Sequence, residues 1–236
     1  MRRINTYLPR KVNRYVPAMG YSAACIHNAP HVVEFGPVAV AAAANILSAQ
    51  PIASAGSTTT FLQDNTDPVV SAIAAEFPVG PGFGRCLQVV ADGAATSTVT
   101  VKGRDYLGQP MAETFTLNGT TPVVGVKAFK YIDLVSWSGT SSRTINLGTT
   151  DKLGLPFRMS NVLSEQAAGA RVATLGTFVS PSQTDPATAT TTDPRGTYDP
   201  NTTLDGSTYI SATFIADGRL NSSGNGGLHG LAHYYA

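Results

Sequence analysis

The four histidines are the residues whose spacing most suggests a chemical function, because they form two H-x3-H pairs. His27 pairs with His31 and His229 with His233, and Cys25 lies just before the first pair. Imidazole nitrogens and thiolates are ligands that Zn²⁺ prefers. Proline or glycine interrupts each pair, so helical geometry is not assured, and no C-x2-C or H-E-x-x-H motif accompanies them. We therefore expect chance spacing on loops and no metal site.

Other motifs for catalysis or cofactor binding are missing from the sequence, which contains no G-x-S-x-G, G-x-G-x-x-G or G-x-x-x-x-G-K-[ST]. Cys86 begins an apolar run, which favours a small core residue over a nucleophile. Asp193, Asp199 and Asp205 could hold Ca²⁺ with backbone carbonyls, but they match no EF-hand loop and are interpreted as solvated turn residues. The sequence predicts no catalytic residue, no cofactor and no small-molecule substrate, and we do not expect an enzyme.

Composition excludes several classes of protein. Only 13% of the 236 residues are charged, against about 25% in an average soluble domain. No apolar run reaches the roughly 18 residues of a membrane span, no heptads indicate a coiled coil, and no apolar segment of a secretory signal follows Arg2 and Arg3. Because the net charge is only +1 and low charge promotes association, we expect a surface largely covered by other subunits.

Alternation of apolar and β-branched residues is clearest in the middle of the chain. Residues 96–103 and 112–117 predict two strands joined by a turn around Gly108, and residues 128–137 predict one long strand. Further strands are expected at 87–90, 143–148, 162–163, 170–175 and 209–216. This pattern predicts a mainly β protein, an antiparallel β-sandwich or barrel of the jelly-roll or immunoglobulin-like kind, with one or two short helices at most.

The remaining chain divides by composition into flanking regions. We expect an extended basic arm over residues 1–33 and a mixed linker over 34–83, with a short helix near 67–76 and a helix or buried strand at 38–44. The core β domain then covers residues 84–180. Residues 181–236 are expected to form a long loop rich in Thr, Pro and Asp without regular strand up to 207, the last strand and a tail.

Charge is unevenly distributed between the two ends of the chain. Residues 1–33 carry five basic and no acidic side chains, whereas residues 161–236 carry three basic and six acidic ones. We therefore expect both ends to dock on partners, and the absence of a basic stripe interleaved with aromatic residues argues against nucleic acid as the partner. The expected partner-binding residues are Arg2, Arg3, Arg10, Lys11, Arg14 and Tyr15 in the arm, and Tyr234 and Tyr235 in the tail.

Four short stretches resemble virion structural proteins of tailed bacteriophages, over about residues 84–207. The run from Val99 to Thr120 holds a strand, a D-x-x-G turn and an A-E-T-F-T strand; the others are V-K-A-F-K-Y-I from Val126, L-G-T-T-D-K-L-G-L-P from Leu147, and T-D-P-R-G-T-Y-D-P from Thr192. The resemblance implies no catalytic residues. It implies turn glycines and core residues instead: Gly103, Gly108, Gly119, Gly148 and Gly154 for turns, and Phe115, Phe129 and Ile132 for the core.

The function implied by this resemblance is that of a capsid decoration (cement) protein. Such a protein is made in the host cytoplasm, is found in the virion, and contacts the major capsid protein and copies of itself. Two alternatives remain open: a neck, tail or fibre-associated virion protein, and a carbohydrate-binding or hydrolytic β protein. For the last alternative, the lone tryptophan is Trp137, and its neighbours predict a core position at a strand end.

Overall fold

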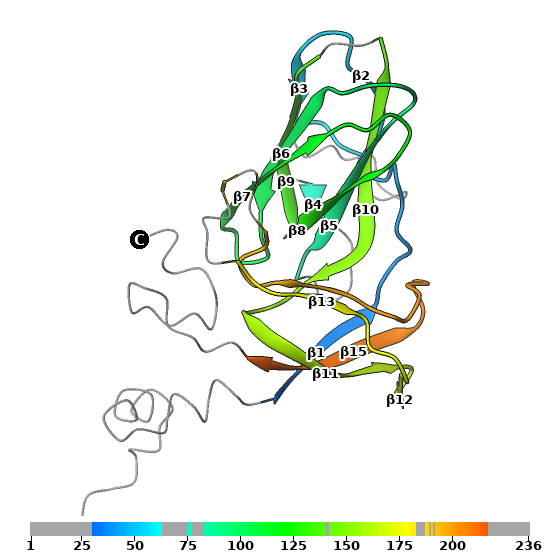
Figure 1. The fold of residues 1–236 in the computed structure, drawn as a ribbon, viewed down its shortest axis with the longest axis vertical. Helices are drawn as coiled ribbons and strands as arrows, with labels where there is room; N and C mark the ends of the chain where they lie inside the picture. Colours follow the sequence, from blue (N-terminus) through cyan, green and yellow to red (C-terminus); the bar gives the residue numbers. More distant parts are fainter. Residues whose placement is uncertain are drawn as a thin grey trace, which may run out of the picture.

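The computed structural model describes an all-β, antiparallel protein (Figure 1). The described residues are 30–62, 75–76, 83–139, 142–182, 187–188, 190 and 192–216, and they contain no helix. No helix in this part of the chain is therefore long and apolar enough to cross a membrane. The expected mainly β fold, a sandwich or barrel, is confirmed.

Two sheets form the upper sandwich in Figure 1, and the second of them extends through β14 and β13 toward the lower part of the molecule. One sheet has the order β3-β9-β6-β7, with β4 also paired to β9, and the other has the order β13-β14-β10-β5-β8, with β2 also paired to β10. The first comprises β3 (Gly56–Thr58), β4 (Ala75–Glu76), β6 (Thr98–Arg104), β7 (Pro110–Thr116) and β9 (Tyr131–Trp137). The second comprises β2 (Leu47–Pro51), β5 (Arg85–Ala91), β8 (Val123–Phe129), β10 (Thr144–Gly154), β13 (Thr177–Val179) and β14 (Thr197–Asp199).

A third sheet, which we call the terminal sheet, lies at the lower end of the molecule (Figure 1). Its strand order is β1-β15-β11-β12. The strands are β1 (Pro30–Pro37), β11 (Met159–Ala167), β12 (Ala170–Arg171) and β15 (Tyr209–Ala216). The first and last long strands of the described chain are therefore hydrogen-bonded neighbours.

Two hydrophobic cores correspond to these two parts. The upper core lies within the sandwich and includes Phe115 and Phe129. The lower core lies against the inner face of the terminal sheet and includes Phe35 and Phe214, whose rings meet edge to face. Strand β10 contributes to both, because its first half supplies the upper core and Leu153 near its end supplies the lower one. The two parts are thus joined by one continuous strand.

The expected single strand at 128–137 is wrong, because the chain turns a corner at Lys130. Strand β8 ends at Phe129 and pairs with β5, whereas β9 begins at Tyr131 and pairs with β6 in the other sheet. Phe129 and Ile132 are both fully buried. In an unbroken strand, residues three apart point to opposite faces. The corner allows both side chains to enter the same core.

Several expectations for the first part of the chain also need correction. Residues 30–33, assigned to an extended arm, form the start of β1. The alanine-rich residues 38–44 form neither a helix nor a strand. Of the helix expected near 67–76, only residues 75–76 are described, and they form strand β4 against β9.

The later part of the chain is more ordered than expected. Of the strand expected at 170–175 only β12 is present, and a tight turn in which Ala168 and Gly169 have positive φ joins it to β11. The expected loop 181–207 contains β14, which pairs with both β10 and β13. The last strand, expected at 209–216, is confirmed as β15.

Only two of the five expected turn glycines lie in turns. Gly108 and Gly119 have positive φ values of 82° and 58°. Gly103, Gly148 and Gly154 lie within strands, where there is no room for a side chain. A Cβ on Gly148, for example, would lie 1.8 Å from the carbonyl oxygen of Ala42. These glycines are therefore required by close backbone approach.

Gly148→Ala should accordingly destabilise the protein by roughly 3 kcal/mol or more, because the backbone of residues 42–43 must move. The matched control is Gly108→Ala, where a Cβ meets nothing within 4 Å and only the positive φ is unfavourable. We expect this variant to lose about 1 kcal/mol of stability. Urea denaturation of both variants measures the difference. Equal losses would show that steric closeness at Gly148 is not what matters.

Candidate functional site

The D-x-x-G turn brings a carboxylate to the junction between the two cores. Asp105 Oδ1 accepts hydrogen bonds from the backbone amides of Leu107 (2.8 Å) and Gln109 (2.9 Å), which closes the turn around Gly108. Its other oxygen, Oδ2, accepts a hydrogen bond from Arg195 Nη2 at 2.8 Å. Both side chains of this ion pair are 1% exposed. Two motifs that lie 90 residues apart in sequence therefore meet in a buried ion pair.

An aromatic ring covers the buried guanidinium. Arg195 lies over the ring of Tyr106, 4.7 Å from its centroid, and the Tyr106 hydroxyl donates a hydrogen bond to the carbonyl oxygen of Pro156. Burial raises the pKa of the Tyr106 phenol, with Arg195 opposing the shift. A desolvated cation–π contact adds to the ion pair. The turn, the guanidinium and the segment after β10 are thus packed as one unit.

A second carboxylate holds the T-D-P-R-G segment against the sandwich. Asp193 Oδ1 accepts the backbone amide of Arg195 at 2.8 Å, and Oδ2 accepts the amide of Ala128 on β8 at 3.0 Å. Asp193 is 2% exposed, and desolvation raises its pKa although Arg195 favours the ionised form. The free edge of β8 is therefore capped by a side chain from a distant loop.

A buried lysine and glutamate lie on the neighbouring strands. Glu113 Oε1 accepts the backbone amide of Val126 at 2.6 Å, and Lys127 Nζ donates to the carbonyl oxygens of Ala112 (2.7 Å) and Thr188 (2.5 Å). Burial raises the pKa of the Glu113 carboxyl to about 7, although the backbone amides of Val126 and Lys127 and the Lys127 charge favour its ionised form. We call Asp105, Glu113, Lys127, Asp193 and Arg195 the junction network.

Each member of the junction network is at most 5% exposed. A general acid, base or nucleophile must reach its substrate, directly or through one water. The hydrogen bonds of these groups go instead to one another, to backbone atoms of their own turns and to backbone atoms of other segments. The arrangement therefore fixes the positions of loops and strands, and no group of three potential metal ligands occurs within the described ranges.

A further buried carboxylate anchors the terminal sheet. Glu165 on β11 is fully buried. Burial alone would raise its pKa, but hydrogen bonds from Tyr198, Thr202 and Asn201 outweigh it and lower the pKa. Its two oxygens accept five hydrogen bonds, from Gly176 N (3.1 Å), Tyr198 Oη (2.6 Å), Asn201 N (3.0 Å), Thr202 N (2.9 Å) and Thr202 Oγ1 (2.7 Å). This carboxylate ties β11 to β14 and to the loop after it.

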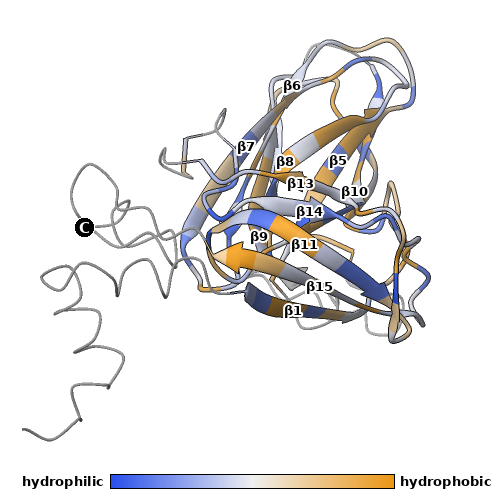
Figure 2. Ribbon diagram, turned by 60° about the horizontal axis from the view of Figure 1, so that its bottom comes forward, coloured by the Kyte–Doolittle hydropathy of each residue, from blue (hydrophilic) through white to orange (hydrophobic). Residues whose placement is uncertain are grey.

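The terminal sheet also has a face that no described residue covers. Val33, Phe35 and Phe214 point to the lower core. The alternate residues of the same strands point outward, and among them Val32 is 65% exposed. Figure 2 shows this sheet turned toward the viewer, with β1, β15 and β11 side by side. The outer face is the clearest candidate for contact with another molecule.

The expected partner-binding residues all lie outside the described residues. These are Arg2, Arg3, Arg10, Lys11, Arg14, Tyr15, Tyr234 and Tyr235. Of the histidines only His31 is described, and its ring packs edge-on against Phe157 at 5.0 Å. Cys86 is fully buried, as expected for a core residue. Trp137 is confirmed at the end of β9 as a core residue, and its indole N–H donates to the Ser54 carbonyl oxygen at 3.0 Å.

The sequence interpretation missed the buried charges. Asp193 was expected to be a solvated turn residue, and this is wrong. A signal was present, because Asp193 is followed two residues later by Arg195 and then by a glycine that takes a φ of 89°. Asp205 fits the expectation, since it is exposed and caps its own turn by accepting the amides of Ser207 and Thr208.

No protein-family model, curated protein or solved structure matches the chain. The resemblance to phage virion proteins therefore stays a prediction from four short motifs. Two of those motifs, D-x-x-G and T-D-P-R-G-T-Y-D-P, contribute the two partners of the Asp105–Arg195 pair. Their residues are thus explained by contacts within the fold.

Removing one partner of the buried pair should strongly destabilise the protein. Arg195→Met leaves the Asp105 carboxylate buried without its countercharge, and we expect a loss of about 3–5 kcal/mol. The matched control is Arg104→Met, because Arg104 pairs with Asp133 at 3.0 Å on the surface, where the expected loss is below about 1 kcal/mol. The free energy of unfolding in urea measures both. Similar losses for the two variants would contradict the role of the buried pair.

Glu113 should make stability depend on pH near neutrality. Its folded pKa is raised from 4.5 to about 7, so between these values the native state binds more protons than the unfolded chain. Its contribution to stability is complete below pH 4.5 and falls by about 3 kcal/mol as the pH rises to 7. Glu113→Gln cannot ionise, so its free energy of unfolding relative to wild type should rise by that amount over the same window. A constant difference would contradict this assignment.

Proposed function

We propose that the protein is a non-enzymatic virion structural protein, most simply a decoration (cement) protein that stabilises a bacteriophage head. Its partners would be the major capsid protein and copies of itself. The observation that carries the proposal is the contrast between the interior and one face. The buried ionisable groups of the junction network and Glu165 bind backbone and side-chain atoms of the fold, while the outer face of the terminal sheet is uncovered by any described residue.

The points at which the two terminal segments join the described fold support an assembly role. Pro30 and Ile215 are register partners in β1 and β15, so residues 1–29 and 217–236 attach at the same end of the terminal sheet. The first of these segments carries five basic side chains and no acidic one. A basic segment that is attached at the end of an uncovered sheet face is suited to contact with a large, acidic or apolar partner surface. Screening in salt weakens exposed pairs beyond about 10 Å, so the charge would orient the contact more than hold it.

The mechanism of stabilisation would be interfacial. Each contact gains roughly 25 cal/mol per Å² of apolar surface removed from water. In a symmetric shell the same contact is repeated at every equivalent position, so a modest gain for one copy adds up over the particle. The two buried cores and the strand β10 that joins them would keep the bridging molecule stiff under load.

Binding to capsids tests this function directly. We expect the full chain to co-sediment with assembled capsids of the phage that encodes it, and not to bind free coat-protein monomers. Replacing Arg2, Arg3, Arg10, Lys11 and Arg14 by serine should weaken binding at least tenfold and reduce its salt dependence. The control is the replacement of the exposed Lys102 and Arg143 by serine, which should leave binding unchanged.

Failure of the unmodified chain to co-sediment with capsids would contradict the proposal. Binding that survives the five-residue change would refute the role of the arm alone. The number of copies bound per particle separates the shell from the alternative positions. Many copies spread over the head indicate the shell, whereas a few copies at one place indicate the neck or tail.

A further inference from the structure

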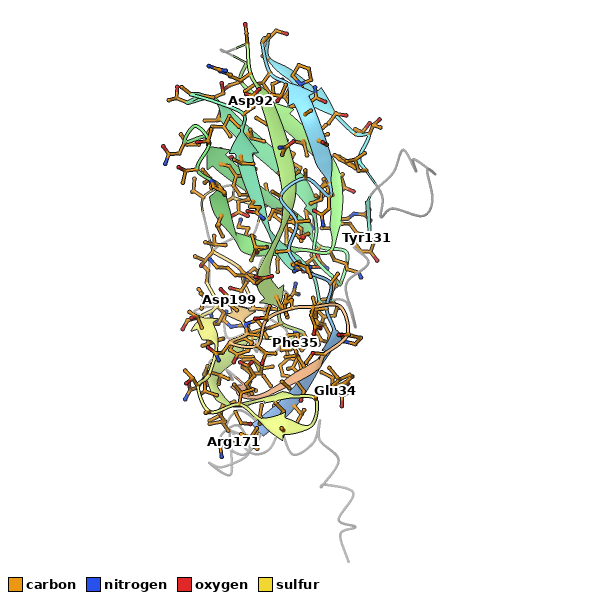
Figure 3. The ribbon with its side chains drawn as sticks, turned by 90° about the vertical axis from the view of Figure 1, so that its right-hand side faces the viewer. Glu34, Phe35, Asp92, Tyr131, Arg171 and Asp199 are labelled. Carbon is orange, nitrogen blue, oxygen red and sulfur yellow. The ribbon has the colours of Figure 1, made fainter. Side chains whose placement is uncertain are left out.

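The outer face of the terminal sheet carries charges of opposite sign at its two edges. The register pairs Glu34 with Ser211, Ser211 with Gln166, and Gln166 with Arg171. Residues directly opposite one another in antiparallel strands share a face. Glu34 and Arg171 therefore belong to one row across all four strands, with Glu34 on edge strand β1 and Arg171 on edge strand β12. Both are exposed, and Figure 3 shows them at opposite sides of the sheet.

The middle of the same face carries uncharged, mostly small or β-branched side chains. The neighbouring row contains Val32, Thr213 and Ser164, in register on β1, β15 and β11. Val32 is 65% exposed, and Leu163 beside Ser164 is also exposed. At the end of the same face Tyr209 is exposed, and the nearby Glu34 carboxylate raises the pKa of its phenol. An uncovered sheet face of this kind normally packs against another layer.

This distribution of charge is self-complementary. When a second copy is stacked face to face by a twofold axis that runs parallel to the strands, between β15 and β11, the edge β1 of one copy lies over β12 of the other. Glu34 of each copy then faces Arg171 of its partner, and Thr213 faces Ser164. Strands of the two sheets remain aligned, as in sheet-on-sheet packing at about 10 Å. That gap can be spanned by a glutamate and an arginine side chain together.

We propose that the outer face of the terminal sheet is the surface through which two copies of this chain associate, about a twofold axis along the strands. Interfaces of this type use the same patch on both subunits. Each dimer contains the Glu34–Arg171 contact twice, and the Val32 side chains are buried beside β11. The inference rests on the self-association part of the proposed function and specifies its surface.

Charge reversal with rescue tests the pairing in the full chain. Sedimentation equilibrium should show a monomer–dimer equilibrium whose dissociation constant increases about tenfold or more for Glu34→Arg and for Arg171→Glu, because each variant converts two attractive contacts into repulsive ones. The double variant Glu34→Arg/Arg171→Glu should restore association. Rescue also excludes misfolding as the cause of the single-variant effects.

A second substitution tests the exposed apolar residue on edge strand β1. Val32→Asp should abolish the dimer, whereas Val40→Asp, at a valine that is 61% exposed outside the sheet, should not change it. A chain that stays monomeric at every concentration overturns the inference. So does a dimer that is indifferent to Val32→Asp, or one that the double charge reversal fails to restore.

Capsid co-sedimentation of the same samples separates this inference from the proposed function. A chain that binds capsids but never dimerises retains the proposed function and overturns the twofold surface. A chain that dimerises as described but does not bind capsids has the surface and lacks the decoration role.

Discussion

The buried Asp105–Arg195 ion pair is the interaction on which the rest of the structure depends. It joins the turn between β6 and β7 in the upper sandwich to the segment that leads into β14. From there the Tyr198–Glu165 hydrogen bond continues the connection into the terminal sheet. A buried pair contributes specificity of position more than net stability, because both charges must be desolvated. The position it specifies is that of the terminal sheet relative to the sandwich.

Local pattern predicted much of the fold. Alternation at 96–103, 112–117 and 209–216 identified three strands, because each of these strands has one buried face. The pattern failed where tertiary contact decided the outcome. The corner at Lys130 is invisible in a run of apolar residues, since only the pairing of β8 and β9 with different sheets separates them. Residues 38–44 have high helix propensity, yet the Ala42 carbonyl accepts the amide of Thr149 on β10.

The candidate sites were less predictable than the fold. The acids in the Thr- and Pro-rich stretch have the composition of solvated turns, and nothing local shows that Asp193 lies against the edge of β8. The charge row on the terminal sheet was equally hidden, because Glu34 and Arg171 share a face only through the register of three strand pairs. The expected binding residues of the arm and tail lie outside the described residues and remain predictions. The pairing register of strands that are distant in sequence therefore decides which charged residues share a surface.

Through these contacts the junction network makes the sandwich and the terminal sheet one cooperative unit. Native-state hydrogen exchange of the intact chain measures this cooperativity. The amides of Leu107, Gln109, Ala128 and Arg195, which donate to the two network aspartates, should exchange with the same free energy of opening as core amides in β6 and β15. Exchange of the β15 and Arg195 amides at a lower free energy than those of β6 would show that the terminal sheet opens by itself, and would contradict a single cooperative unit.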